Sequence, residues 1–384
     1  MTSRLVSVAT ALPSHRLDPG AALAQLRRFW PRLERLVEAD AALGTRYTCE
    51  PVDRLLGRRG LEALRDAYLE HARDLTVAAA RKALQAAEIG GADVDLIISV
   101  SCTGYLVPAL DVYLVEDLGL RPDVLRLPIT ELGCSAGAAA LAAAHRHLQA
   151  FPEQKVLVTA VELPSLSFQP GDGSLDNLTA CLVFGDGGGA AVLAGGEAGE
   201  RGLQLLRAAS YLVPGTADLL GFDLRDDGFH VVLDRRLPRV LAGELRAVVD
   251  RFLGPGGLGA LDFVAAHAAG PRIFEVVESA LRLRPGMLDL SRAVFAEVGN
   301  TSSAAIFFTL ERVLGALGGR PARGLGLGLG PGVSIELMQL DWVPSENARY
   351  EASAPGERAA VGGRRVQETL LGPNPVDEDG RVQS

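Results

Sequence analysis

Short apolar blocks and amphipathic blocks alternate along this chain. Continuous apolar runs rich in β-branched residues are typical of buried strands, whereas apolar residues spaced three and four apart predict helices. The expected strands cover residues 5–13, 94–104, 155–163 and 187–196, and the expected helices cover residues 76–89 and 110–120. This alternation predicts an α/β fold in which helices pack against sheets.

Two segments of the first half recur, in the same order, in the second half. Residues 132–145 and 298–317 both place a glycine, a chemically useful side chain and small residues at a helix start. Residues 184–196 and 328–340 both lead from a glycine turn into a strand, so the pattern predicts duplicated halves. The expected division is 1–200 (with a helical, Arg-rich insertion at 18–74), 201–341, and a flexible extension at 342–384.

Cys134 lies where an expected strand, 126–130, meets an expected helix, 135–148. The first turn of a helix has unpaired N–H groups and a positive dipole end, and both stabilise an anion such as a thiolate. The alternative is an inert, buried cysteine in an Ala-rich core helix. Position alone leaves both interpretations open.

Composition excludes several classes of function. The 384 residues carry a formal net charge of −9, which argues against a nucleic-acid groove or a polybasic membrane anchor. No run of apolar residues is long enough to span a bilayer, and the N-terminus has no signal-peptide pattern. Four scattered cysteines favour reduced thiols in a cytoplasmic protein over a disulfide framework or a metal site.

Two further residues could complete a catalytic group with Cys134. His267 follows an apolar strand and precedes a Gly-Pro turn, and Asn300 occupies the second strand-to-helix junction of the repeat. Taken singly, His267 could be a structural histidine and Asn300 a helix N-cap, a role that Ser302 or Ser303 could share. The three residues together favour catalysis.

These residues resemble the thiolase superfamily, and more narrowly type III polyketide synthases of the chalcone synthase kind. The matching motifs are ELGCSAG at 131–137, LVFGDGGGAA at 182–191, HAAGP at 267–271, GNTSSA at 299–304 and GLGPG at 328–332. The resemblance covers roughly residues 3–340 and implies a thiolase-like αβαβα layered sandwich built from two duplicated halves. Leu329 stands where the family commonly has an aromatic residue, and Ala269 where it commonly has a glycine.

The resemblance also bears on the reaction. Residues 101–111, 161–187 and 219–240 look most like bacterial alkylpyrone and alkylresorcinol synthases, which use fatty acyl starters. The SLSFQP segment also resembles bacterial tetrahydroxynaphthalene synthases, which are primed by malonyl-CoA. The rival enzyme class is a ketoacyl-ACP synthase III that performs one condensation, and the non-enzymatic rival is an inactive partner subunit.

By this resemblance Cys134 attacks an acyl-CoA thioester and carries the growing chain. His267 pairs with the thiolate and, together with Asn300, donates hydrogen bonds to the enolate formed when malonyl-CoA loses carbon dioxide. We expect the Cys134 thiolate to persist below neutral pH, since the helix dipole and an imidazolium both favour it. Neither a metal nor a redox cofactor is expected, because CoA thioesters are the substrates.

Further site residues follow only from the resemblance. Phe184 and Phe229 match the aromatics between the CoA tunnel and the cavity, although each could be an ordinary core phenylalanine. The expected cavity residues are Cys102, Ser167, Gly221 and Ser302, and Val107 matches a residue that reaches into the neighbouring subunit of a homodimer. The expected CoA contacts are Arg46, Gly270 and Arg272, where the two arginines could equally be surface residues; the signature loop contains Gly328, Gly330, Pro331 and Gly332.

Overall fold

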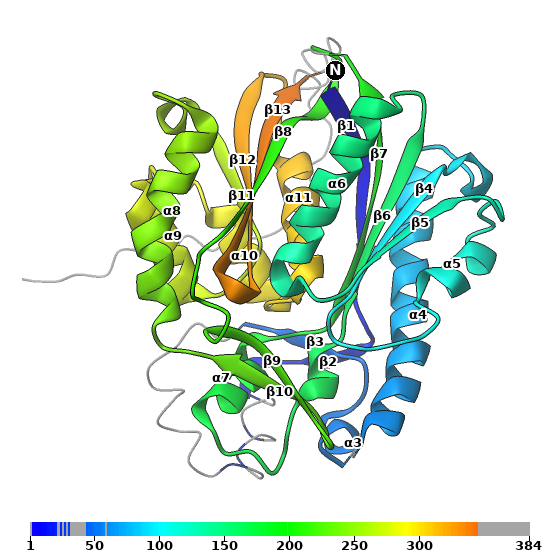
Figure 1. The fold of residues 1–384 in the computed structure, drawn as a ribbon, viewed down its shortest axis with the longest axis vertical. Helices are drawn as coiled ribbons and strands as arrows, with labels where there is room; N and C mark the ends of the chain where they lie inside the picture. Colours follow the sequence, from blue (N-terminus) through cyan, green and yellow to red (C-terminus); the bar gives the residue numbers. More distant parts are fainter. Residues whose placement is uncertain are drawn as a thin grey trace, which may run out of the picture. The chain divides into compact units, whose positions relative to one another are not determined.

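A nine-stranded mixed sheet organises the structure, with strand order β11-β12-β13-β8-β1-β7-β6-β4-β5 (Figure 1). The computed structural model describes residues 2–20, 24, 27, 30, 44–57, 60–197 and 199–344. The strands of this sheet are β1 (Thr2–Ala11), β4 (Leu96–Val100), β5 (Leu125–Ile129), β6 (Lys155–Glu162), β7 (Gly187–Gly196), β8 (Gly202–Leu212), β11 (Phe263–Ala266), β12 (Ala322–Gly330) and β13 (Ser334–Val343).

The strand order repeats within this sheet. In the first half β1 pairs antiparallel with β7, β7 antiparallel with β6, and β6 parallel with β4. In the second half β8, β13, β12 and β11 follow one another with the same directions. A short antiparallel pairing between β1 and β8 joins the two sets of strands. The same chain direction at equivalent positions is what a duplicated sequence predicts.

Helices pack against the strands of both halves, and two of them contact strands of both halves at once. The described helices are α3 (Val52–Gly57), α4 (Leu61–Ala86), α5 (Asp111–Asp117), α6 (Ala136–Ala150), α7 (Leu175–Val183), α8 (Leu237–Leu253), α9 (Pro271–Leu281), α10 (Asp289–Val298) and α11 (Ala305–Ala316). The α6 and α11 helices contact each other and strands of both halves, whereas α4 packs on β1, β6 and β7, and α8 packs on α9 and β13. The layered α/β architecture is confirmed.

Small side chains allow α6 to lie in the middle of this arrangement. Ala136, Ala138, Ala140 and Ala144 are completely buried, so the strands of both halves approach the helix closely. Close packing of this kind holds the first turn of α6 rigidly. That turn follows directly on Cys134.

Two small sheets lie outside the main one. They are formed by β2 (His15–Leu17) with β3 (Arg46–Thr48), and by β9 (Leu220–Arg225) with β10 (Gly228–Leu233). The β3 strand lies within the expected helical insertion, and α4 runs through its expected end at residue 74. The β13 strand continues to Val343, past the expected start of the C-terminal extension; residues 345–384, like most of 21–43, lie outside the described residues.

Contacts between Cα atoms group residues 1–346 into one unit, so the boundary near residue 200 stays a prediction about the repeat.

In the part of the chain that the structure describes, no helix is both long enough and apolar enough to cross a membrane.

Candidate active site

Cys134 lies in a single 3-10 turn, Gly133–Ser135, between β5 and α6, as the sequence predicted. Gly133 has φ of +55°, and a Cβ there would lie 2.5 Å from Pro331. A Cβ on Gly330 would likewise lie 2.5 Å from the Ser135 hydroxyl. The signature loop therefore packs directly behind the cysteine, and two glycines allow the close approach.

Asn300 lies between helix α10 and the turn Ser302–Ala304 that leads into α11, so the expected strand-to-helix junction is wrong here: the apolar run before Asn300 forms a helix. Its Oδ1 accepts a hydrogen bond from the Ser302 backbone N–H at 2.9 Å, and its Nδ2 donates to the Ala269 carbonyl at 3.3 Å. The N–H donor at Ser302 fixes which end of the amide is oxygen. One Nδ2 proton is thus left for a ligand.

His267 follows β11, and its ring is oriented by the backbone of β12. The His267 N–H donates to the Leu327 carbonyl at 2.9 Å, and its Nδ1 accepts from the Leu329 N–H at 3.3 Å. Because Nδ1 is an acceptor, the neutral ring carries its proton on Nε2. His267 can therefore donate a hydrogen bond without being charged.

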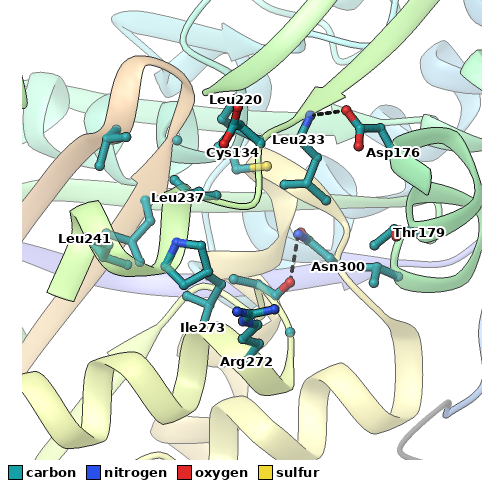
Figure 2. A pocket seen from close by; sticks show the side chains of 18 of the residues that line it. Cys134, Asp176, Thr179, Leu220, Leu233, Leu237, Leu241, Arg272, Ile273 and Asn300 are labelled. Atoms are coloured by element: carbon teal, nitrogen blue, oxygen red, sulfur yellow. Dashed lines mark hydrogen bonds between the residues drawn. The ribbon is translucent and has the colours of Figure 1, made fainter. Parts of the chain in front are cut away.

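Cys134, His267 and Asn300 line one cavity of about 340 Å³ (Figure 2). Cys134 belongs to the first half of the repeat, whereas His267 and Asn300 both belong to the second half. The site therefore forms where the two halves meet. A cavity lined by a thiol, an imidazole and a side-chain amide is suited to acyl transfer, because the N–H donors can stabilise an oxyanion or enolate that forms there. The structure therefore places the three predicted residues on one cavity, and their catalytic roles stay a prediction.

The protonation states differ from the sequence-based expectation. Burial raises the pKa of Cys134 to about 11, only partly offset by the hydrogen bond to Ser302, and burial lowers the pKa of His267 to about 4. Desolvation penalises the charged form of each group, and it is the largest cause of both pKa shifts. Burial therefore opposes the expected thiolate–imidazolium pair and favours a neutral thiol and a neutral imidazole, and the expected pair stays a prediction.

A chain of polar contacts runs from Cys134 into the core. The Cys134 thiol donates to the Ser302 hydroxyl at 3.3 Å, and that hydroxyl lies 3.5 Å from the Cys102 sulfur. The Cys102 thiol donates to Glu162, a completely buried carboxyl group at the end of β6. Glu162 also accepts from the Thr103 hydroxyl at 2.7 Å and from the Ser303 hydroxyl.

Burial raises the pKa of Glu162 above its usual range, because the hydrogen bonds offset only part of the cost of desolvating a carboxylate. The Cys102 thiol has a pKa well above its usual range for the same reason. Glu162 was not among the residues predicted from the sequence. Its signal was weak, a single acidic residue at the end of an otherwise apolar strand.

Several predicted site residues line this cavity, namely Phe184, Gly270, Arg272 and Gly330. Phe184 caps the C-terminus of α7 and forms a bridge with Asn300. Others are not among its lining residues: Phe229, Cys102, Ser167, Gly221, Ser302 and Val107, together with Gly328, Pro331 and Gly332 of the loop. Of these, Cys102, Ser302 and the loop residues stand directly behind the catalytic groups.

The remaining predicted residues lie farther along their elements. Phe229 stacks edge-on against Phe222 within the β9–β10 hairpin, which also contains Gly221. Ser167 is buried, and its hydroxyl donates to the Pro164 carbonyl at 2.7 Å. Val107 is 80% exposed on the loop after β4.

Arg46 is the one predicted CoA contact that the structure contradicts. Its side chain is only 4% exposed, and its guanidinium donates to the carbonyls of Thr45, Leu182 and Phe295 and stacks on the Phe295 ring. Burial lowers the pKa of Arg46 to about 10. Arg46 therefore joins β3 to α7 and α10, and it presents no charge to a phosphate.

The cavity walls are mostly residues that sequence analysis did not single out. Apolar side chains from the hairpin, α8 and α9 predominate, among them Leu220, Leu233, Leu237, Leu241 and Ile273 (Figure 2). Asp176 and Thr179 of α7 add polar atoms. Two exposed arginines, Arg235 and Arg272, also line the cavity. The leucines had no distinctive signal, because they follow the ordinary pattern of an amphipathic helix or strand.

Comparison with known proteins identifies the class to which this site belongs. The family models for chalcone and stilbene synthases match residues 53–197 (N-terminal domain) and 204–344 (C-terminal domain). The chain is 37% identical to 1,3,6,8-tetrahydroxynaphthalene synthase of Streptomyces griseus over 312 residues, which are 80% of this chain and 82% of that protein. It is 28% identical to the alpha-pyrone synthesis polyketide synthase-like Pks18 of Mycobacterium tuberculosis, over 85% and 84% of the two chains.

Solved structures agree with this. The crystal structure of tetrahydroxynaphthalene synthase from Streptomyces coelicolor superposes with a TM-score of 0.83 at 34% identity, covering 89% of this chain and all of that one. Germicidin synthase from the same species gives a TM-score of 0.81 at 28% identity, with 89% and 100% coverage. The chain therefore belongs to the chalcone and stilbene synthase family and has its thiolase-like fold. Within that family it is a type III polyketide synthase, an acyltransferase.

Proposed function

We propose that the protein loads an acyl-CoA starter onto Cys134, extends it iteratively with malonyl-CoA and cyclises the product. Cys134 attacks the thioester carbonyl as a thiolate, the proton released from its thiol passes to the departing CoA thiolate, and a new thioester forms. Loss of carbon dioxide from malonyl-CoA then gives an enolate, which attacks the Cys134 thioester, releases the Cys134 thiolate and leaves the extended chain on CoA. Transfer of that chain back to the sulfur, with release of CoA, starts the next round. The observation that carries this proposal is the convergence of Cys134, His267 and Asn300 on one cavity.

His267 and Asn300 would stabilise the enolate oxygen as neutral donors. The His267 Nε2–H and the second Asn300 Nδ2 proton are both available, since Nδ1 and Oδ1 are held by backbone N–H groups. Fixed donors in a site that excludes water act where charge develops and need no reorganisation. The proton of Cys134 leaves only when the thioester is bound, which is consistent with a neutral thiol in the free protein.

The apolar cavity wall supports a fatty acyl starter and an alkylpyrone or resorcinol-type product. Leu220, Leu233, Leu237, Leu241 and Ile273 offer a surface that an aliphatic chain desolvates favourably. The expected gain is about 0.8 kcal/mol for each buried methylene group.

A second candidate is a malonyl-primed reaction that yields tetrahydroxynaphthalene. It is favoured by relatives of that name, which are 36% and 37% identical to this chain, against 28% for the alpha-pyrone relative. A third outcome, a single condensation, would correspond to a ketoacyl-ACP synthase III activity.

Product analysis separates these candidates. Purified protein is incubated with radiolabelled malonyl-CoA, either alone or with acyl-CoA starters of increasing length, and the products are identified by mass spectrometry. We expect alkylpyrones or alkylresorcinols whose mass follows the starter. A tetrahydroxynaphthalene product from malonyl-CoA alone would replace the first candidate by the second, and a single β-keto product would overturn iteration.

The basic residues at the cavity lining support binding of CoA phosphates. Arg272 is the second residue of α9, and Arg235 precedes α8, so two exposed arginines lie on neighbouring elements. Arginine is suited to phosphate because its planar fork donates two parallel hydrogen bonds. We assign the CoA contacts to this pair in place of the buried Arg46.

The edge of the main sheet supports a homodimer. In the described residues β5 pairs only with β4, and it exposes Leu125 and Leu127, at 53% and 42%. Unpaired edge strands with apolar side chains are templates for pairing with another chain. A two-fold axis would pair β5 with its copy and would also bring the exposed Val107 loop toward the partner.

Four free cysteines support a reduced, cytoplasmic environment.

A further inference from the structure

The β9–β10 hairpin forms a part of the cavity wall that belongs to a two-stranded sheet separate from the main one. It contributes Leu220 and Leu233, which line the cavity at the end of the hairpin nearest Cys134 (Figure 2). The position of this wall relative to α7, which contributes Thr179 and Val183, determines the width available to an acyl chain.

Two hydrogen bonds tie β10 to α7 and to the segment before it. The Gln169 side-chain amide donates to the Phe229 carbonyl at 3.1 Å. The Leu233 backbone N–H donates to Oδ2 of Asp176 at 3.0 Å, as Figure 2 shows. We call the contact of β10 with α7 and with the segment before α7 the hairpin seam; it includes both hydrogen bonds.

His230 lies in the middle of the hairpin seam and is 8% exposed. Its Nε2 is 2.8 Å from Oδ1 of Asp227, its Nδ1 is 3.3 Å from Nη1 of Arg225, and the same Nδ1 is 3.7 Å from Oδ2 of Asp172. Asp172 lies on the segment before α7, whereas Asp227 and Arg225 belong to the hairpin itself. Asp223, opposite His230 in the ladder, faces Arg225 at 3.4 Å.

The Nδ1 atom has two competing partners, and its protonation state selects between them. A neutral ring with its proton on Nε2 donates to Asp227 and accepts from Arg225, so both contacts stay within the hairpin. A protonated ring has an N–H at Nδ1, which repels the Arg225 guanidinium and attracts the Asp172 carboxylate. Arg225 can then keep its contact with Asp223. Protonation thus replaces an internal contact of the hairpin by an ion pair across the seam.

We propose that His230 and Asp172 are positioning residues that set how closely the Leu233 wall approaches α7, and that this approach tightens when His230 is protonated. This inference rests on the proposed function, because it concerns the binding of the acyl starter at the same cavity. The seam acts on binding and not on the reacting atoms, so it should change KM for the acyl-CoA and leave kcat unaltered. A partly buried ion pair of this kind predicts about a two- to fivefold effect.

The test measures KM and kcat for octanoyl-CoA across the pH range in which histidine titrates. In the wild-type protein we expect KM to be about two- to fivefold lower on the acid side of one ionisation. His230→Asn and Asp172→Asn should each remove this inflection, and Asp172→Glu, which keeps the charge, should restore it. His147→Asn, a half-buried histidine on α6 that contacts Gln154, is the matched control and should keep the wild-type profile.

Hydrogen–deuterium exchange of the β10 segment gives a second measurement that needs no turnover. After correction for intrinsic exchange, the Leu233 amide should be more protected at acid pH in the wild-type protein and equally protected at all pH values in His230→Asn. An unchanged KM inflection in His230→Asn, or wild-type protection that does not depend on pH, would overturn the proposal. If the wild-type protein shows no activity with any starter, the proposed function fails, and the exchange data alone decide the role of the seam.

Discussion

At the scale of single residues, burial decides the chemistry of this site more strongly than sequence position does. The helix start favours a Cys134 thiolate, but desolvation outweighs it and raises the pKa to about 11. His267 is desolvated in the same way, and its pKa falls to about 4. These pKa directions favour two neutral groups in the free protein, and the proposed reaction then uses His267 as a hydrogen-bond donor.

Alkylation of Cys134 by iodoacetamide tests these protonation states. Since the thiolate is the reactive form, we expect the rate to rise with pH and to have its midpoint above the ordinary thiol value of about 8.5. His267→Ala should leave this midpoint in place, because a neutral imidazole contributes no charge. A midpoint below neutrality that moves upward in His267→Ala would instead demonstrate a thiolate–imidazolium pair.

Substitution of Asn300 tests the assignment of the second donor. Asn300→Ala should reduce malonyl-CoA-dependent extension by about 100- to 1,000-fold, the usual cost of losing one oxyanion-type donor. The reaction is followed with radiolabelled malonyl-CoA, and circular dichroism confirms that the variant is folded. A loss smaller than about tenfold would remove Asn300 from the catalytic group.

At the scale of elements, the helix starts after Cys134 and Asn300 could be predicted because their signals are local. Small helix-forming residues follow each of them, but the apolar run before Asn300 forms helix α10 and not a strand, since periodicity alone does not separate a buried strand from a buried helix segment. The guanidinium of Arg46 could not be placed in this way, since only packing against α7 and α10 buries it. The cavity walls from α8 and the β9–β10 hairpin likewise arise from tertiary packing of ordinary leucines.

Asp186, just before β7, illustrates how one buried carboxyl group joins several elements. It accepts from the Cys49 N–H at 2.7 Å, and from the Ser165 N–H and hydroxyl at 2.9 and 2.5 Å. Burial nevertheless raises its pKa from 3.8 to about 6. Because the folded pKa lies above the unfolded one, the contribution of Asp186 to stability is present below about pH 4 and is lost as pH rises through about 6.

Chemical denaturation of Asp186→Asn measures this contribution. At about 1.4 kcal/mol for each pH unit, the free energy of unfolding of the variant relative to wild type should increase by up to about 3 kcal/mol between pH 4 and pH 8. Guanidinium titrations of both proteins at the two pH values give the difference. A relative stability that is constant, or that falls with pH, would show that the folded pKa of Asp186 is not raised.

At the scale of the whole molecule, the site is a product of the duplication. The strand order of β1-β7-β6-β4 recurs in β8-β13-β12-β11, and the sulfur and its two donors come from opposite halves. Sequence repetition predicted this pairing, but the distance between the halves depends on the small side chains of α6. The same sheet ends in β5, whose exposed edge supports the proposed dimer.

The oligomeric state of Leu127→Arg tests that interface. A charge in the β5 edge should convert a dimer into a monomer, since it opposes apolar strand pairing. Light scattering coupled to size exclusion gives the mass, and Leu224→Arg on β9, at a leucine that is 62% exposed, is the matched control that should stay dimeric. A wild-type protein that is monomeric at all concentrations would contradict the proposal.

The central claim, that Cys134 carries the acyl chain, is tested most directly by intact-mass spectrometry after exposure to an acyl-CoA without malonyl-CoA. We expect the wild-type protein to gain the mass of one acyl group, peptide mapping to place that group on Cys134, and Cys134→Ala to gain none. An unmodified wild-type protein, or an acyl group that persists in Cys134→Ala, would contradict this account.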